Sequence, residues 1–141
     1  MQAERIKELL QLFNEQAPIA RYFGMRLSFT DEANAVIDLP HNPNLDHALG
    51  GIHGGVYATM LDNAGWFTSA AARDISCWVA TSELSIHFLE PARCTSLRAV
   101  GRLLKHGKRQ DIVEMRLYDG QGRWIGHGVG TFVLLPSVPL S

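Results

Sequence analysis

The apolar residues near the start of the chain recur at helical spacing. Between residues 3 and 13 they fall on one helical face, with charged residues between them; the apolar positions are Ile6, Leu9, Leu10 and Phe13. The pattern predicts an amphipathic N-terminal helix, which Pro18 ends or bends. Residues 24–29 and 35–39 are then predicted as short strands around a polar turn at 30–34, and residues 40–51, rich in Pro, Asn, Asp and Gly, as a loop.

Residues 56–72 differ from the rest of the chain because they are mostly apolar or small and contain one charge, Asp62. Such a segment predicts a helix that is buried nearly all round. It does not predict a membrane span, because it is short and has a carboxylate at its centre.

The remaining pattern is that of strands. Residues 77–89 alternate between two faces, one with Leu84, Ile86 and Phe88 and the other with Thr81, Glu83, Ser85 and His87. Further strands are predicted at 97–104, 111–118 and 124–135, with a hairpin turn at Asp119-Gly120-Gln121-Gly122 between the last two. One buried helix followed by four strands makes an α+β fold, in which the helix lies against a single sheet.

Three glycines share one face of the last predicted strand, because Gly126, Gly128 and Gly130 occupy alternate positions. Glycine weakens a strand, so this row predicts that another backbone, that of the buried helix, approaches closely there. A loose or bulged edge strand is the alternative.

Composition and charge narrow the class of protein. The 141 residues suit a single domain spanning 1–141, and 46% hydrophobic with 19% charged residues is an ordinary globular balance. A formal net charge of −1 gives no global electrostatic reason to expect nucleic acid or an anionic membrane as partner. The 2 cysteines form no CxxC pair, and the first ten residues lack the apolar stretch of a signal peptide, so we expect a cytoplasmic protein.

Asp62 is the first candidate for chemistry. An ionised aspartate is costly to bury unless it is paired or hydrogen-bonded, and Asp is a mediocre helix former. Its place in an apolar helix therefore points to a catalytic carboxylate. The alternative is an aspartate that is partly exposed at a subunit or domain surface, or that is bonded to Asn63 or Thr59.

The predicted helix begins after a glycine-rich stretch, Gly50-Gly51-Ile52-His53-Gly54-Gly55. Glycines at a helix start leave backbone N–H groups unobstructed, and the helix dipole favours developing negative charge, so this is a candidate oxyanion hole. A phosphate loop is a weaker interpretation because no Gly-Lys-Ser/Thr follows, and a plain glycine-rich loop is the other alternative.

The spacing between Gly54 and Asp62 predicts a composite site. Eight residues of helix separate them by about 12 Å, whereas both groups must come within about 3 Å of the reacting atoms. We therefore expect Asp62 of one chain to act with Gly54 of a second copy related by two-fold symmetry, in an obligate dimer.

With these residues in view, the sequence resembles the hotdog-fold thioesterases, and among them the PaaI-like subgroup. The stretch 50–55 followed by Asp62 is similar to the family's G-x-x-H-G-G motif, whose catalytic acid lies nine residues after the histidine. Residues 81–92 are similar to the family's central strand with its proline-terminated end, and residues 119–132 to its closing hairpin. The resemblance covers nearly the whole chain after Gly24.

The resemblance implies an α+β hotdog fold, in which an antiparallel β-sheet wraps a long central helix, here preceded by an N-terminal helix. It implies a homodimer whose two sheets join, and dimers that pair into a homotetramer. The implied activity is metal-independent hydrolysis of an acyl- or aryl-CoA thioester to free acid and CoA. No cofactor is implied, since CoA is part of the substrate.

The resemblance also implies roles for catalytic residues. Asp62 would be nucleophile or general base, the Gly54 N–H would polarise the thioester carbonyl, and His53 would help to position it. Thr81 falls where relatives place a Ser or Thr that holds the attacking water or supports the acid.

The sequence departs from the family pattern at His47, six residues before the motif histidine, where many relatives have Asn. An imidazole can donate or accept a hydrogen bond and titrates near neutrality. His47 therefore either replaces that Asn or simply lies in the loop.

Candidate substrate-binding residues lie around the catalytic ones. Gly55 and Asn63 adjoin them in sequence, while Trp66 and Phe67 follow the acid by about one turn and line either an acyl pocket or plain core. A basic turn at residues 105–109 contains Lys108 and Arg109; in relatives this region lies near the CoA phosphates, and a solvated hairpin tip is the alternative.

Other functions are less well supported by the sequence. The histidines show no metal-ligand spacing with Cys or carboxylates, so no metal is expected, and no Ser-centred nucleophile elbow is present. A hotdog hydratase or dehydratase would need a differently placed His–carboxylate pair. The alternative from another class is a non-catalytic hotdog protein that binds acyl-CoA or another hydrophobic ligand.

Overall fold

The computed structural model describes residues 2–73 and 77–140. The elements in chain order are α1 (Gln2–Gln11), the π-helical turn η1 (Leu12–Gln16), α2 (Pro18–Phe23), β1 (Arg26–Phe29), β2 (Ala35–Leu39), the 3-10 turn η2 (Pro43–Leu45), α3 (Gly54–Ala71), β3 (Cys77–Phe88), β4 (Leu97–His106), β5 (Gln110–Asp119) and β6 (Trp124–Pro139).

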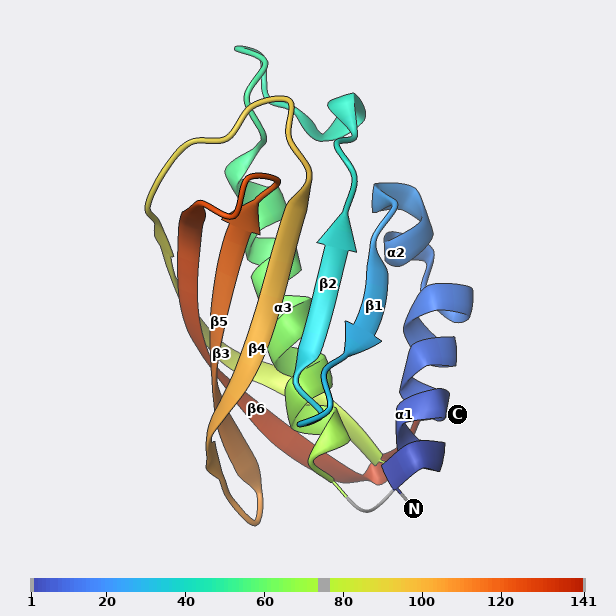
Figure 1. The fold of residues 1–141 in the computed structure, drawn as a ribbon. Helices are drawn as coiled ribbons and strands as arrows, with labels where there is room; N and C mark the ends of the chain where they lie inside the picture. The colour runs from blue at the N-terminus through green and yellow to red at the C-terminus, as the bar shows by residue number, and fades with distance from the viewer. Residues whose placement is uncertain (1, 74–76, 141) are drawn as a thin grey trace.

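A single antiparallel sheet of six strands curls around α3 (Figure 1). The strand order is β1-β2-β4-β5-β6-β3, so β1 and β3 form its two edges. The helix α3 contacts every strand from β2 to β6, and the core lies between the helix and the sheet. The predicted α+β fold, with a long central helix and a preceding N-terminal helix, is confirmed.

The N-terminal segment contains more helix than the sequence pattern predicted. The amphipathic helix is present as α1, and the chain continues through η1, where Phe13 is buried. Pro18 then starts the further helix α2 instead of only ending the first, because its fixed φ and missing N–H suit the first helical position. Gly24, with φ of 89°, ends α2 in the left-handed conformation that glycine adopts without steric cost.

The central helix is less completely buried than expected. Most of its residues are buried, but a half-exposed stripe runs along one side, formed by Thr59, Asp62, Asn63 and Trp66. This stripe lies beside the edge strand β3, since Asp62 and Trp66 both form hydrogen bonds with that strand. A single chain therefore leaves the candidate acid accessible from outside.

A bulge in β3 changes which residues face α3. The register against β6 shifts between Thr81 and Glu83, so Ser82 is the extra residue. Thr81 consequently bonds to α3, while Leu84 packs against the same core. The prediction from simple alternation, which put Thr81 and Leu84 on opposite faces, is wrong for this reason.

The glycine row in β6 has a different cause from the one predicted. β6 lies between β5 and β3, so it is not a loose edge strand. A Cβ at Gly130 would lie 2.7 Å from the ring of Phe132, and one at Gly128 would lie 3.3 Å from the Met115 methyl group. Core side chains thus fill the space. The backbone of α3 approaches instead at Gly101 in β4, where a Cβ would lie 2.6 Å from the carbonyl oxygen of Ala64.

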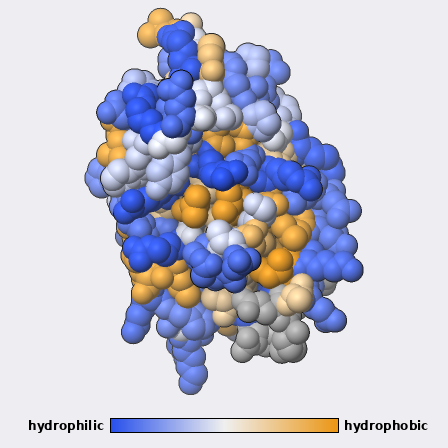
Figure 2. Space-filling model, in the orientation of Figure 1, coloured by the Kyte–Doolittle hydropathy of each residue, from blue (hydrophilic) through white to orange (hydrophobic). Residues whose placement is uncertain are grey.

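The surface in the orientation of Figure 1 is mixed. Figure 2 shows hydrophobic areas near the middle of this face, interrupted and bordered by hydrophilic residues. None of the helices in the described part of the chain combines the length and apolar character needed to cross a membrane.

Candidate active site

Asp62 projects from the middle of α3 toward β3. Its Oδ1 accepts a hydrogen bond of 2.8 Å from the Thr81 hydroxyl. The proposed bonds to Thr59 and Asn63 are not formed, because the Thr59 hydroxyl donates to the Gly55 carbonyl and the Asn63 amide donates to the Thr59 carbonyl. Burial raises the pKa of Asp62, and the hydrogen bond from Thr81 partly offsets this rise. The carboxyl is thus a stronger base than an ordinary aspartate.

A cavity of about 440 Å³ opens beside Asp62. Its volume falls within the about 300–1,000 Å³ that is usual for small-molecule sites. Residues from η1, α2, α3 and β3 line it: Leu12, Phe13, Gln16, Ala17, Pro18, Ile19, Asp62, Asn63, Trp66, Phe67 and Trp78.

Aromatic rings make up much of this wall. The ring centroids of Trp66 lie 5.0 Å from those of Trp78 and 4.7 Å from those of Phe67, and Phe13 meets Phe67 edge-on at 5.1 Å. The Trp66 indole N–H donates to the Val79 carbonyl, which fixes its orientation. Phe67 is buried in the core and also lines the cavity with Trp66, so it belongs to the core and to the cavity wall alike.

The N-terminus of α3 carries the candidate oxyanion donor. His53 is the N-cap, and its Nδ1 accepts a 2.8 Å hydrogen bond from the Gly55 N–H. A neutral ring with an accepting Nδ1 carries its proton on Nε2, which can then donate to another group. No acceptor for the Gly54 N–H occurs within residues 2–73 and 77–140, as expected for the first turn of a helix.

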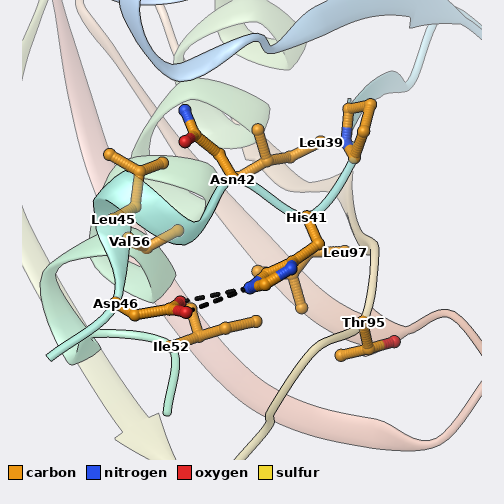
Figure 3. A pocket seen from close by; sticks show the side chains of 10 residues that line it. Leu39, His41, Asn42, Leu45, Asp46, Ile52, Val56, Thr95 and Leu97 are labelled. Atoms are coloured by element: carbon orange, nitrogen blue, oxygen red, sulfur yellow. Dashed lines mark hydrogen bonds and ion pairs between the residues drawn. The ribbon is translucent and has the colours of Figure 1, made fainter. Parts of the chain in front are cut away.

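The loop before α3 is held in place by several contacts. Asp46 pairs with Ile52 in an isolated bridge, and both carboxylate oxygens of Asp46 lie near Nε2 of His41, at 3.1 and 3.3 Å (Figure 3). The cavity next to this pair measures about 10 Å³, the size of one water at most. His41 and Asp46 therefore brace the loop and leave no room for a substrate.

His47 lies in the same loop and is exposed. Its Nδ1 accepts a 3.2 Å hydrogen bond from the Leu49 N–H, and a Cβ at Gly51 would lie 2.6 Å from its Nε2. His47 is thus at the Gly54 end of α3.

The basic turn lies at the other end of α3, at the tip of the β4–β5 hairpin (Figure 1). A fully buried carboxylate, Asp111, anchors it. Asp111 accepts a 2.6 Å hydrogen bond from the Ser69 hydroxyl of α3, and its other oxygen lies 2.7 Å from Nδ1 of His106. Lys108 and Arg109 are exposed and do not line the cavity at Asp62.

The structure therefore sorts the predicted site residues into three groups along α3. Asp62, Thr81, Asn63 and Trp66 lie together at its middle, while Lys108 and Arg109 lie near its C-terminal end. The third group, at the N-terminal end, is His47, His53, Gly54 and Gly55. No set of three or more His, Cys, Asp and Glu in the described ranges could hold a metal ion.

One part of the cavity wall, the segment from η1 to the start of α2, was not predicted from the sequence. Leu12 and Ile19 have no motif, and their role depends on the path of the chain in space. The only local signal was Pro18, a residue that starts helices as well as ending them.

The chain is similar in sequence to known proteins. The family model of the thioesterase superfamily matches residues 49–124. A Saccharolobus solfataricus protein with the name "putative esterase" is 25% identical over 130 residues, which cover 92% of each chain.

Solved structures extend this likeness. A Bacillus halodurans protein determined with CoA has 28% identity and a TM-score of 0.81, with 96% of this chain and 91% of that chain covered. The E. coli PaaI protein from the phenylacetic acid degradation operon has 17% identity, a TM-score of 0.84 and coverage of 98% and 99%, and so shares the fold.

Proposed function

Because the chain belongs to the thioesterase superfamily and has its hotdog fold, we propose that it is an acyl-CoA thioesterase, which hydrolyses an acyl- or aryl-CoA to free acid and CoA with Asp62 as catalytic carboxylate. The observation that carries the proposal is the place of Asp62, half-buried and hydrogen-bonded by Thr81 in the wall of a largely apolar cavity. The CoA in the Bacillus halodurans relative supports CoA as the leaving group.

The reaction follows from the chemistry of these groups. Ionised Asp62, as general base, takes a proton from a water held by Thr81 while the water oxygen attacks the thioester carbon. The carbonyl oxygen becomes negative and is stabilised by the Gly54 N–H at the positive end of α3, with the Nε2–H of His53 as a second donor. The C–S bond then breaks, and the proton on Asp62 passes to the departing CoA sulfur.

A nucleophilic route uses the same residues. Asp62 would attack the thioester carbon itself, release CoA and form a mixed anhydride, which water would then hydrolyse. Label in the Asp62 carboxylate after a single turnover in ¹⁸O-labelled water identifies this route, because attack of water on the Asp62 carbon of the anhydride leaves the water oxygen there.

We place the second half of the site on another copy of the chain. Gly54 and Asp62 of one chain are separated by about two turns of α3. The edge strand β3 runs beside Asp62, and its outer edge is free to pair with β3 of a second chain around a two-fold axis. The opposite edge, β1, has 4 residues and contacts α1 and η1, which makes it the poorer edge for pairing.

The test is hydrolysis of a panel of aryl-, short- and medium-chain acyl-CoA thioesters, followed by detection of the free thiol. Asp62→Asn keeps the shape of the side chain and removes the base, so we expect turnover to fall by about 10²- to 10⁴-fold. Equal activity of Asp62→Asn and wild type would contradict the assignment. Binding of the thioesters without any turnover would instead identify a non-catalytic acyl-CoA-binding protein.

A further inference from the structure

The cavity at Asp62 has two walls of different origin. One wall comes from α3 and β3 and carries Asp62, Trp66 and Trp78. The other comes entirely from the N-terminal segment, residues 12–19, which belongs to none of the motifs that identify the family. If Asp62 marks the position of the thioester carbonyl, as proposed above, the N-terminal wall lies beside that position, across the same cavity.

The N-terminal wall is held firmly in place. Asn14 pairs with the backbone of Leu27 in β1 through two hydrogen bonds, one accepted from the Leu27 N–H at 2.8 Å and one donated to its carbonyl at 3.0 Å. The buried ring of Phe13 meets Phe67 edge-on. The π-helical geometry of η1 permits Asn14 to reach β1 while its neighbours Leu12 and Phe13 line the cavity.

The charges of the lining restrict what the cavity can bind. Among the described residues that line it there is no Lys or Arg, and the one charged group is the Asp62 carboxylate. A second carboxylate on the acyl group would lose its hydration there without gaining a cation as partner. The cavity suits an uncharged chain or ring.

We propose that residues 12–19 form the selecting wall of the acyl site, that Ala17 and its neighbours set the size of the acyl group accepted, and that this group is apolar and uncharged. The inference rests on the proposed function and adds a specificity element to it. Ala17 is the most informative position to substitute, because it lines the cavity between η1 and α2. Its φ of −77° and ψ of 114° suit any L-residue.

The first test measures selectivity. Ala17→Leu fills part of the cavity, so the ratio of kcat/KM for octanoyl-CoA to kcat/KM for acetyl-CoA should fall at least about tenfold, a change of roughly 1.4 kcal/mol. Ala3→Leu, the same change at an exposed position of α1, is the matched control and should alter neither substrate. In wild type, an octanoyl thioester with a terminal carboxylate should react at least about tenfold less efficiently than octanoyl-CoA. Equal losses for both chain lengths, or no discrimination against the carboxylate, would overturn the inference.

The second test does not need turnover. The chain has 3 tryptophans, and Trp66 and Trp78 line the cavity whereas Trp124 does not. In a Trp124→Phe background, the non-hydrolysable octyl-CoA thioether should change the indole fluorescence and CoA alone should not. Ala17→Leu should weaken thioether binding at least about tenfold. Hydrolysis with no fluorescence response would refute the selecting wall and leave the thioesterase proposal intact. A fluorescence response without hydrolysis would refute the thioesterase proposal and leave the binding role of the wall intact.

Discussion

At the scale of single residues, the state of Asp62 depends on two opposing effects. Burial raises the pKa of Asp62, and the Thr81 hydroxyl lowers it by bonding to the ionised form. Catalysis requires the ionised carboxylate, so the acidic limb of the pH–rate profile should lie above the pH at which an ordinary aspartate titrates. Between the pKa of an ordinary aspartate and the higher pKa of Asp62 in the folded chain, the folded chain binds more protons than the unfolded chain. The contribution of Asp62 to stability therefore falls as the pH rises through this interval.

Thr81→Val tests this balance. Valine has the shape of threonine without the hydroxyl, so the pKa of Asp62 should rise further and the acidic limb of kcat/KM should move to higher pH. Thr81→Ser keeps the hydroxyl and should leave the limb near its wild-type position. An unmoved limb in Thr81→Val would mean that the hydrogen bond does not control the titration of Asp62.

The two residues differ in how far the sequence revealed them. Asp62 could be predicted because a single charge in an apolar helix is costly and therefore conspicuous. The contact between Thr81 and Asp62 could not be derived from periodicity, because the bulge at Ser82 breaks the alternation. The family resemblance indicated a role for Thr81, whereas the strand pattern alone put Thr81 and Leu84 on opposite faces of the strand.

At the scale of elements, the contact between α3 and β4 depends on Gly101. A Cβ there would lie 2.6 Å from the Ala64 carbonyl oxygen, which belongs to helix backbone and cannot move alone. We expect Gly101→Ala to lower the free energy of unfolding by about 1 to 3 kcal/mol, measured by denaturant titration.

Gly128→Ala is the comparison for this prediction. Its Cβ would lie 3.3 Å from the flexible end of Met115, and alanine also reduces the entropy of the unfolded chain. The loss of stability should therefore be smaller than for Gly101→Ala. A reversed order would show that the helix backbone yields more easily than the core side chains.

The β4–β5 hairpin presents Lys108 and Arg109 at its tip, while Asp111 ties the hairpin to α3 through Ser69. If these cations contact the CoA phosphates, Lys108→Ala and Arg109→Ala should raise KM and leave kcat unchanged. The KM of wild type should also depend more strongly on salt concentration than the KM of either variant. Lys7→Ala, at an exposed position of α1, is the control and should change neither constant. Unchanged KM in both hairpin variants would identify a solvated tip without a binding role.

Element limits were closely predicted for two apolar runs that are flanked by polar, Gly or Pro residues. The helix predicted at 56–72 is α3 at Gly54–Ala71, and the strand predicted at 35–39 is β2 at Ala35–Leu39. The helix α2 was not predicted, since its 6 residues are too few to establish a period and Pro18 signals both a start and a stop.

At the scale of the whole molecule, the distance along α3 decides how many chains make one site. Gly54→Pro removes the N–H and keeps the backbone path, because proline fits the first helical position and the extended conformation of His53, with ψ of 138°, suits a residue before proline. A Cβ at Gly54 would lie 3.3 Å from the exposed ring of Phe88, which has to shift to admit the proline ring. Asp62→Asn removes the base. Each variant alone should have turnover about 10²-fold or more below that of wild type.

We predict that mixing the two variants under conditions of subunit exchange restores part of the activity. Half of the dimers formed at random carry one site with both groups intact, so about a quarter of wild-type activity should return. Gly54→Ala, which keeps the N–H, should be active without mixing. If each site were built within one chain, the mixture would stay inactive.

The bulge at Ser82 has a consequence for how the length of this chain can change. In a regular strand with one buried face, the loss of one residue turns the side chains beyond it to the opposite face. Here the extra residue is Ser82, and deleting it would leave Thr81 and Leu84 two positions apart, so regular alternation would keep both on the face toward α3. Deletion of Ser82, which is exposed, should therefore be tolerated far better than deletion of one residue from a regular part of β3.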